Sequence, residues 1–220
     1  MIAMEIAVKV SFKAKEILAR IEGSTKLGDL RTIAKEIKKD HALAMELWSA
    51  GGFMPRQLAI LIMDPKQLDT ATIDRLDHDI QQHAQKEKLQ LIDWLMANQL
   101  AKDKPLTALM LSWKDADSPL KRRLFWYYNA RLRWVGQEPP PDSEELLSVI
   151  ENGIEKEEPE VQWAMNFLAA QIGIFQPEFR SRCIALGERT GLYKDEIVPR
   201  NCTPNYLPEF IRMQVAKLKK

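Results

Sequence analysis

Apolar residues recur at three- and four-residue spacing in nearly every segment of the chain, which is the pattern of amphipathic helices. Long alternating runs rich in Val, Ile and Thr, which would indicate strands, are absent from the sequence. Gly and Pro residues fall near the ends of the periodic segments. The pattern therefore predicts an all-α protein, with helices at 2–21, 26–39, 41–50, 54–63, 69–80, 88–101, 104–114, 119–135, 142–156, 159–174, 177–189 and 204–218.

The second half of the chain shows a regular spacing of predicted helix pairs. Successive pairs begin at residues 104, 142 and 177, which are 38 and 35 residues apart. Antiparallel helix pairs at this spacing are typical of HEAT-like repeats, in which each pair buries its apolar face by stacking on its neighbours. We therefore predict a HEAT-like helical-repeat α-solenoid, an α-α superhelix with a concave basic face. An irregular helical bundle is the alternative.

We expect residues 1–220 to form a single domain of this kind. In this interpretation residues 1–25 contribute an N-terminal helix, residues 26–175 form the repeat core, and residues 176–220 form the C-terminal capping helices. The inner surface of such a solenoid is where its function normally lies.

Charge is balanced over the chain but unevenly distributed along it. Lys and Arg total 32 against 31 for Asp and Glu, so the net charge of +1 does not by itself indicate a nucleic acid or membrane partner. Residues 1–39 and 114–136 each carry a local charge of +4, whereas residues 137–160 carry −8. A basic lining with an acidic outer loop would suit a polyanionic partner, although most charge runs are solvated faces.

Several kinds of chemistry are disfavoured by the sequence. The two cysteines, Cys183 and Cys202, are too few for a disulfide framework or a four-ligand zinc site, and they suggest a reducing compartment. No segment has the roughly 18 apolar residues of a membrane span. Gly-rich phosphate loops, paired metal-ligand motifs and a Gly-x-Ser-x-Gly elbow are also missing from the sequence. We expect a cytoplasmic, monomeric protein without a metal, a cofactor or a membrane partner.

The predicted helix at 119–135 combines basic and aromatic residues. Its apolar stripe consists of Leu120, Leu124, Tyr127, Tyr128, Trp134 and Val135, and Arg131 falls inside it. At about 100° per residue, a second face gathers Arg122, Trp126, Asn129 and Arg133. A guanidinium group can donate two parallel hydrogen bonds to the oxygens of one phosphate, and an aromatic ring can pack on a sugar or base. In the alternative interpretation the arginines pair with neighbouring acids and the indole packs inside the protein.

Two more helices carry candidate functional side chains. In the helix at 88–101, Asp93 lies on or beside the apolar stripe, so its carboxylate should be partly desolvated. Such a group either pairs with a structural partner or is held for catalysis. In the helix at 159–174, Trp163 and Phe167 share one face, which is usually a core arrangement.

Several segments, in this order and spacing, resemble the DNA alkylation repair family, the AlkD-like HEAT-repeat DNA glycosylases. The resemblance covers roughly residues 24–175, and a weaker similarity extends to residues 202–211. The segments that carry it are Lys26–Ile37, Asp40–Ala50, Arg56, Leu58–Pro65, Asp93-Trp94, Leu120–Arg123 and Val161–Phe167.

This resemblance implies a protein that binds duplex DNA, especially alkylated DNA, on a basic concave surface. It also implies hydrolysis of the N-glycosidic bond of positively charged N3- or N7-alkylated purines without base flipping. Asp93 matches the family's catalytic aspartate, which stabilises the sugar cation as the bond breaks. Arg122 matches the DNA-contacting arginine, and we expect it to converge with Asp93 on one hollow. The further DNA-binding candidates are Trp126, Arg133, Trp163 and Phe167.

Two positions depart from the family pattern. Leu89 stands where the family has an indole one helical turn before the aspartate, and Phe167 stands in place of a second tryptophan. Leucine offers no π face to a cationic lesion, and phenylalanine offers a weaker one than tryptophan. A catalytically weak or inactive module for distorted or branched DNA is therefore one alternative function. A protein-interaction solenoid is another.

Overall fold

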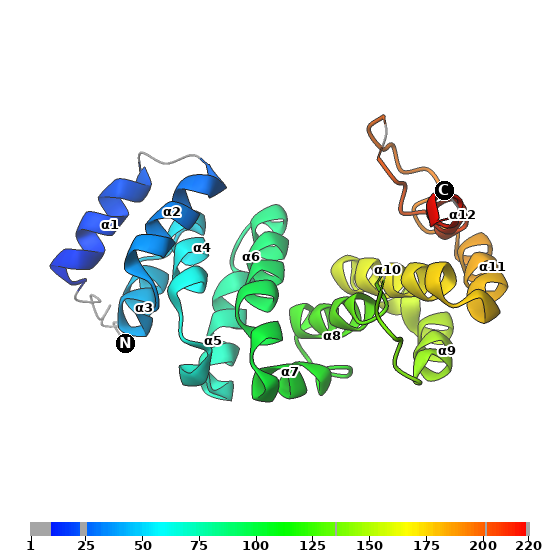
Figure 1. Cartoon of the computed structure of the whole chain (residues 1–220), viewed down its shortest axis with the longest axis horizontal. Helices are drawn as coiled ribbons and strands as arrows, with labels where there is room; N and C mark the ends of the chain where they lie inside the picture. Colours follow the sequence, from blue (N-terminus) through cyan, green and yellow to red (C-terminus); the bar gives the residue numbers. More distant parts are fainter. Residues whose placement is uncertain (1–9, 23–25, 135, 201, 219–220) are drawn as a thin grey trace, which may run out of the picture. The chain divides into compact units, whose positions relative to one another are not determined.

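The computed structural model describes residues 10–22, 26–134, 136–200 and 202–218. These residues form twelve α-helices and no strand, which confirms the all-α prediction (Figure 1). The predicted helix at 2–21 is described from α1 onward, since residues 1–9 lie outside the described residues. The helices are α1 Phe12–Glu22, α2 Leu27–Ile37, α3 His41–Ser49, α4 Phe53–Ile62, α5 Thr70–Gln81, α6 Gln85–Asn98, α7 Lys104–Leu111, α8 Pro119–Arg131, α9 Ser143–Gly153, α10 Pro159–Phe175, α11 Arg180–Thr190 and α12 Leu207–Leu218.

Side-chain caps fix where several of these helices begin. Asp40 accepts a hydrogen bond from the backbone N–H of Leu43, at 3.1 Å, at the start of α3. The hydroxyl oxygen of Ser118 accepts from the N–H of Lys121, at 3.3 Å, at the start of α8, where a proline also occupies the first turn. Each bond satisfies a backbone donor that the helix itself leaves without a partner.

The chain divides into two compact units, residues 1–110 and 111–220. The boundary falls inside the segment predicted as one repeat core, and the single-domain organisation stays a prediction. The first unit is built from α1 to α6 and most of α7. Its α2 packs on α4, and α4 packs on α6, while α3 and α5 pack against α4 and α6 respectively. The core of this unit includes Leu47, Trp48, Leu58, Ile60 and Leu91.

In the second unit α8 packs along α10, and α10 also packs on α12. Helices α9 and α11 contact α10 as well, so α10 lies at the centre of the unit. Two glycines allow the close approach of the last helices. A Cβ on Gly173 would lie 2.7 Å from Ile211 Cδ1, and one on Gly187 would lie 2.5 Å from Pro208 Cδ. In both units the even-numbered helices therefore lie next to one another.

None of the described helices is long and apolar enough to cross a membrane.

Candidate nucleic-acid interface

Three of the four residues of the basic and aromatic face predicted for α8 are buried. Trp126 is 2% exposed, Asn129 3% and Arg133 1%. The prediction of an exposed face is wrong because α8 is buried on several sides, and its buried residues also include Leu120, Leu124 and Phe125. Trp126 packs edge-on against Phe125, with ring centroids 4.9 Å apart. The alternative interpretation, in which this indole packs inside the protein, is the one that the structure shows.

Arg133 joins the end of α8 to the start of α9. Its Nε donates to Ser143 Oγ at 2.9 Å, its Nη1 donates to the carbonyl of Asn129 at 3.0 Å, and its Nη2 pairs with Asp142. Ser143 Oγ in turn donates to Gln176 Oε1 at 2.7 Å. Burial lowers the pKa of Arg133, and the neighbouring carboxylate partly offsets this effect. The guanidinium is thus enclosed in a structural network and has no route to a phosphate.

Arg122 is also held by protein groups, although its side chain stays partly exposed. Nε and Nη2 bind Glu157 at 3.2 and 3.0 Å, and Nη2 also binds Glu158. Nη1 donates to the carbonyls of Ala116, at 2.7 Å, and Asp117. Burial opposes the charged form, but the two carboxylates outweigh it and raise the pKa of Arg122. A phosphate contact would therefore require the DNA to displace these carboxylates.

The acidic segment 137–160 pairs with arginines of the same unit. Besides Asp142, Glu157 and Glu158, its Glu144 and Glu151 bind Arg182 at 2.5 and 2.6 Å. It therefore neutralises basic side chains within the protein and is not the separate outer loop that would suit a polyanion. Arg131, whose partner the sequence does not reveal, places its guanidinium 5.1 Å from the ring centroid of Trp134.

Partly exposed aromatic rings form a row across the even-numbered helices of the second unit. On α10, Trp163 and Phe167 are stacked, with centroids 5.3 Å apart and planes 6° apart. Tyr127 of α8 lies edge-on to both, and Phe210 of α12 lies edge-on to Phe167 at 6.1 Å. We call Tyr127, Trp163, Phe167 and Phe210 the aromatic row. Each ring is neither fully buried nor fully exposed, so part of it faces solvent.

A buried arginine supports this row. Arg123 places its guanidinium carbon 4.5 Å from the ring centroid of Trp163 and 5.7 Å from that of Tyr127. Its Nη1 donates to the carbonyl of Glu160 at 3.0 Å. Because Arg123 is 3% exposed, its guanidinium interacts with the faces of these rings rather than with solvent. Arg123 thus places a buried cation against two of the four rings of the row.

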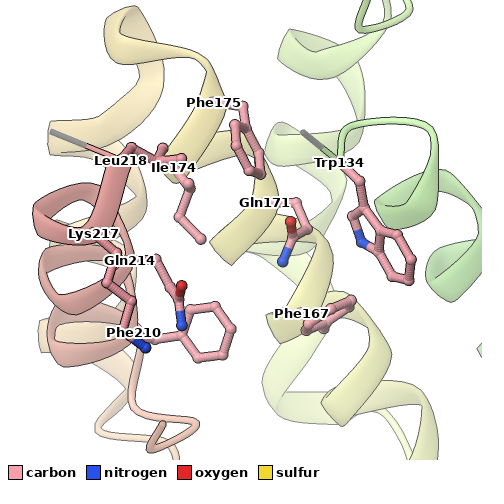
Figure 2. A pocket seen from close by; sticks show the side chains of 9 residues that line it. All are labelled: Trp134, Phe167, Gln171, Ile174, Phe175, Phe210, Gln214, Lys217 and Leu218. Atoms are coloured by element: carbon pink, nitrogen blue, oxygen red, sulfur yellow. The ribbon is translucent and has the colours of Figure 1, made fainter. Parts of the chain in front are cut away.

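A groove of about 480 Å³ continues from the row between α10 and α12 (Figure 2). Aromatic and aliphatic side chains form most of its lining, with two glutamines and one lysine. The lining residues are Trp134, Phe167, Gln171, Ile174, Phe175, Phe210, Gln214, Lys217 and Leu218.

Asp93 lies on α6 in the first unit and is half-buried, as its position beside the apolar stripe predicts. Leu89, one turn earlier, is half-buried as well. The side chain of the following residue, Trp94, contacts residues of α4 and α2. Its Nε1 donates to the carbonyl of Gln57 on α4 at 3.3 Å, and the exposed Arg31 of α2 lies 5.3 Å from its ring centroid. An indole of α6 and a guanidinium of α2 therefore lie together on the even-numbered helices of the first unit.

The described residues were also compared with the needs of a metal site. No cluster of three or more His, Cys, Asp or Glu side chains in the described part of the chain could hold a metal ion. The convergence of Asp93 with Arg122 stays a prediction, since the first belongs to residues 1–110 and the second to residues 111–220.

Comparison with known proteins places this arrangement in a family. The sequence model of the DNA alkylation repair enzyme family matches residues 24–190, which is most of the chain. The chain belongs to the DNA alkylation repair enzyme family. The resemblance of the segments between Lys26 and Phe167 is thereby confirmed. A comparison with curated proteins finds no match.

One similar solved structure supports the fold of this DNA alkylation repair family member. It has a TM-score of 0.67 and 18% sequence identity, over 94% of this chain and 89% of that chain. That protein is of a new family related to the HEAT-like repeat DNA glycosylases, with affinity for branched DNA structures. The likeness confirms the prediction of a HEAT-like helical-repeat fold.

Two groups of this family member were missed by the sequence reasoning. Arg31 lies inside one of the segments that carry the resemblance, but no pattern connects it with Trp94, 63 positions along the chain. Arg123 was overlooked beside Arg122 because a helix wheel does not tell which of two adjacent arginines meets an aromatic neighbour. Both contacts depend on the packing of even-numbered helices.

Proposed function

We propose that this protein is a DNA repair glycosylase-like protein of the cytoplasm. It binds duplex DNA and hydrolyses the N-glycosidic bond of N3- or N7-alkylated purines without base flipping. The observation that carries the proposal is the half-buried Asp93 on α6, which lies within the segment that matches the family. A carboxylate at this depth is less screened than one in water and stabilises a developing cation more strongly.

The proposed reaction needs little acid catalysis because the alkylated base already carries a positive charge. The bond between the sugar C1′ and the base nitrogen breaks, its electron pair goes to the base, and the base leaves neutral. Asp93 stabilises the resulting sugar cation. Water adds to C1′ and gives up a proton to the carboxylate and then to solvent. Asp93 also orients this water.

The other groups bind the DNA. In the first unit, Arg31 is exposed over Trp94 and contacts a phosphate of the DNA. In the second unit, Trp163 and Phe167 offer their partly exposed faces to a sugar or base. Trp126 and Arg133 have no part in this proposal because they are buried. Arg122 can contact a phosphate only if its ion pairs with Glu157 and Glu158 are broken first.

The test is release of 7-methylguanine and 3-methyladenine from methylated duplex DNA by an excess of protein. Asp93→Asn should lower the single-turnover rate by about 10²-fold or more, as expected for the loss of a preorganised electrostatic stabiliser. Asp74→Asn is the matched control, since Asp74 is exposed on α5. Absence of base release by the wild-type protein at enzyme excess excludes the glycosylase function.

A DNA-binding module without catalysis is the second candidate, and Leu89 is the observation that favours it. Without an indole one turn before Asp93, the lesion loses a π contact there. In that case duplex or branched DNA is bound with a steep salt dependence. Arg31→Ala should weaken binding across unrelated sequences, and comparison with Arg122→Ala tells which arginine contacts phosphate. Unmeasurable DNA binding at low salt would leave a protein-interaction solenoid.

A further inference from the structure

The groove between α10 and α12 is lined by a glutamine whose side-chain amide the fold leaves without a partner. Gln171 is 6% exposed and lines the groove, yet its side chain makes no hydrogen bond with another described residue. Figure 2 shows this amide pointing from α10 into the groove. The amide atoms reach the groove, so their donor and acceptor are free to bind a polar group there. The position of Gln171 therefore provides a hydrogen-bonding site on a groove wall that is otherwise mostly apolar.

The walls of the groove are suited to a flat ligand. Phe167 and Phe210 pack edge to face with centroids 6.1 Å apart, so the two rings contact each other and form one continuous aromatic wall. Trp134, which is 39% exposed, lies on the other side of Gln171 (Figure 2). Aromatic side chains of this kind form stacking platforms for nucleobases, since every base has a π face.

The rim of the groove carries groups that complement a nucleotide. Lys217 is exposed and makes no ion pair within the described chain. Gln214 donates from Nε2 to Thr203 Oγ1 at 3.0 Å, which leaves its carbonyl oxygen to accept a hydrogen bond. The groove thus combines aromatic walls, two amides and one cation.

We propose that this groove receives one unpaired nucleobase of DNA. The amide of Gln171 donates to and accepts from the exposed base edge, the rings of Phe167 and Phe210 contact the base, and Lys217 contacts the adjoining phosphate. Adjacent donors and acceptors on a base edge match the donor and acceptor of a side-chain amide. The base is already unpaired, as at a bulge, a branch or a single-stranded end. The inference rests on the proposed DNA binding but not on glycosylase activity.

Fluorescence anisotropy with three DNAs of one sequence tests the proposal on the full chain. They are a perfect duplex, a duplex with a single bulged base, and the same bulge with an abasic tetrahydrofuran residue in place of the base. The bulged base should bind about tenfold more tightly than the abasic bulge, because stacking and edge hydrogen bonds are lost without the base. The abasic arm separates recognition of the base from recognition of bent DNA.

Gln171→Leu should remove this tenfold preference and leave affinity for the perfect duplex unchanged. Gln57→Leu is the matched control, since Gln57 is fully buried in the first unit and its side-chain amide also lacks a partner. Lys217→Gln, on the exposed rim, should weaken binding of the bulged DNA and make its salt dependence shallower by about one unit of slope. Lys217→Gln keeps the proposal testable should the core variant fail to fold.

Three results would overturn the inference. If the wild-type protein binds the bulged base and the abasic bulge with equal affinity, the groove does not recognise the base, although the protein still binds DNA. A preference that survives both Gln171→Leu and Lys217→Gln assigns the base to another surface. Absence of binding to all three DNAs at low salt refutes the proposed DNA binding as well, so the two failures are distinguishable.

Discussion

Replacement of Arg133 by methionine separates a structural role from a DNA-binding role for this arginine. The side chain is fully buried and holds Ser143 Oγ and the carbonyl of Asn129 at 2.9 and 3.0 Å, in addition to Asp142. Methionine has a similar length but donates no hydrogen bond. The change therefore removes the tie between α8 and α9 without leaving a large cavity.

The expected cost follows from these contacts. Hydrogen bonds from a charged donor contribute about 1.5–3 kcal/mol each. The loss is reduced because the buried guanidinium no longer has to be desolvated, because Ser143 keeps Gln176 as its acceptor, and because Asp142 is 42% exposed. We expect the free energy of unfolding to fall by about 2–3 kcal/mol, which lowers Tm by about 5–10 °C. Affinity of the folded variant for DNA should not change.

Thermal unfolding followed by circular dichroism, with DNA binding measured well below Tm, checks both expectations. Arg189→Met is the control, since its pair with Glu155 is about half exposed on both sides and should contribute less than about 1 kcal/mol. If Arg133→Met kept the wild-type Tm but bound DNA about tenfold more weakly with a shallower salt dependence, Arg133 would be a phosphate contact and the structural interpretation would fail.

Three further predictions concern the second unit. Gly187→Ala should destabilise the protein by about 1–3 kcal/mol, because its Cβ would overlap Pro208 and Leu207, whereas Gly28→Ala, with no neighbour within 4 Å, should be neutral or stabilising in thermal unfolding. Thiol titration at pH 8 should detect the exposed Cys202 but not Cys183, whose pKa is raised to about 12 chiefly by burial; two reactive thiols in the native protein would contradict this. Burial also raises the pKa of Tyr193 to about 12 from 10.0, so its contribution to stability is present below pH 10 and lost as the pH rises towards 12. Tyr193→Phe should therefore lose stability less steeply than wild type between pH 10 and 12 in denaturant titrations.

The sequence predicts the helices well because most of them have one apolar stripe and clear end signals. Helix α8 shows where this reasoning fails. Its buried residues Arg123, Leu124, Phe125 and Trp126 are consecutive, so no single stripe describes them. A helix packed on several sides loses the periodicity that defines an exposed face. Arg123, the charged residue among them, is buried against the ring of Trp163 and donates to the carbonyl of Glu160, and both of these residues belong to α10.

The candidate site shows a similar division between local and long-range information. Half-burial of Asp93 follows from its place beside a stripe, which is local. The aromatic row requires Tyr127, Phe167 and Phe210 to meet from three helices, and the groove additionally needs the chain to return through α12. No spacing along the sequence encodes such contacts, so their chemistry becomes evident only once the even-numbered helices are packed together.

Leu89→Trp tests whether the missing indole on α6 limits catalysis. Leu89 is half-buried one turn before Asp93, so the larger ring can extend towards solvent without entering the core. If the protein is a glycosylase whose lesion contact is weak, the indole should raise the single-turnover rate of base release by about tenfold, the scale of a desolvated cation–π contact. Leu89→Phe should give a smaller gain, since its ring attracts a cation less strongly. A protein that only binds DNA should gain affinity for methylated duplex without any release of base. An unchanged rate of base release alongside active wild-type protein would show that the missing indole at position 89 does not limit catalysis.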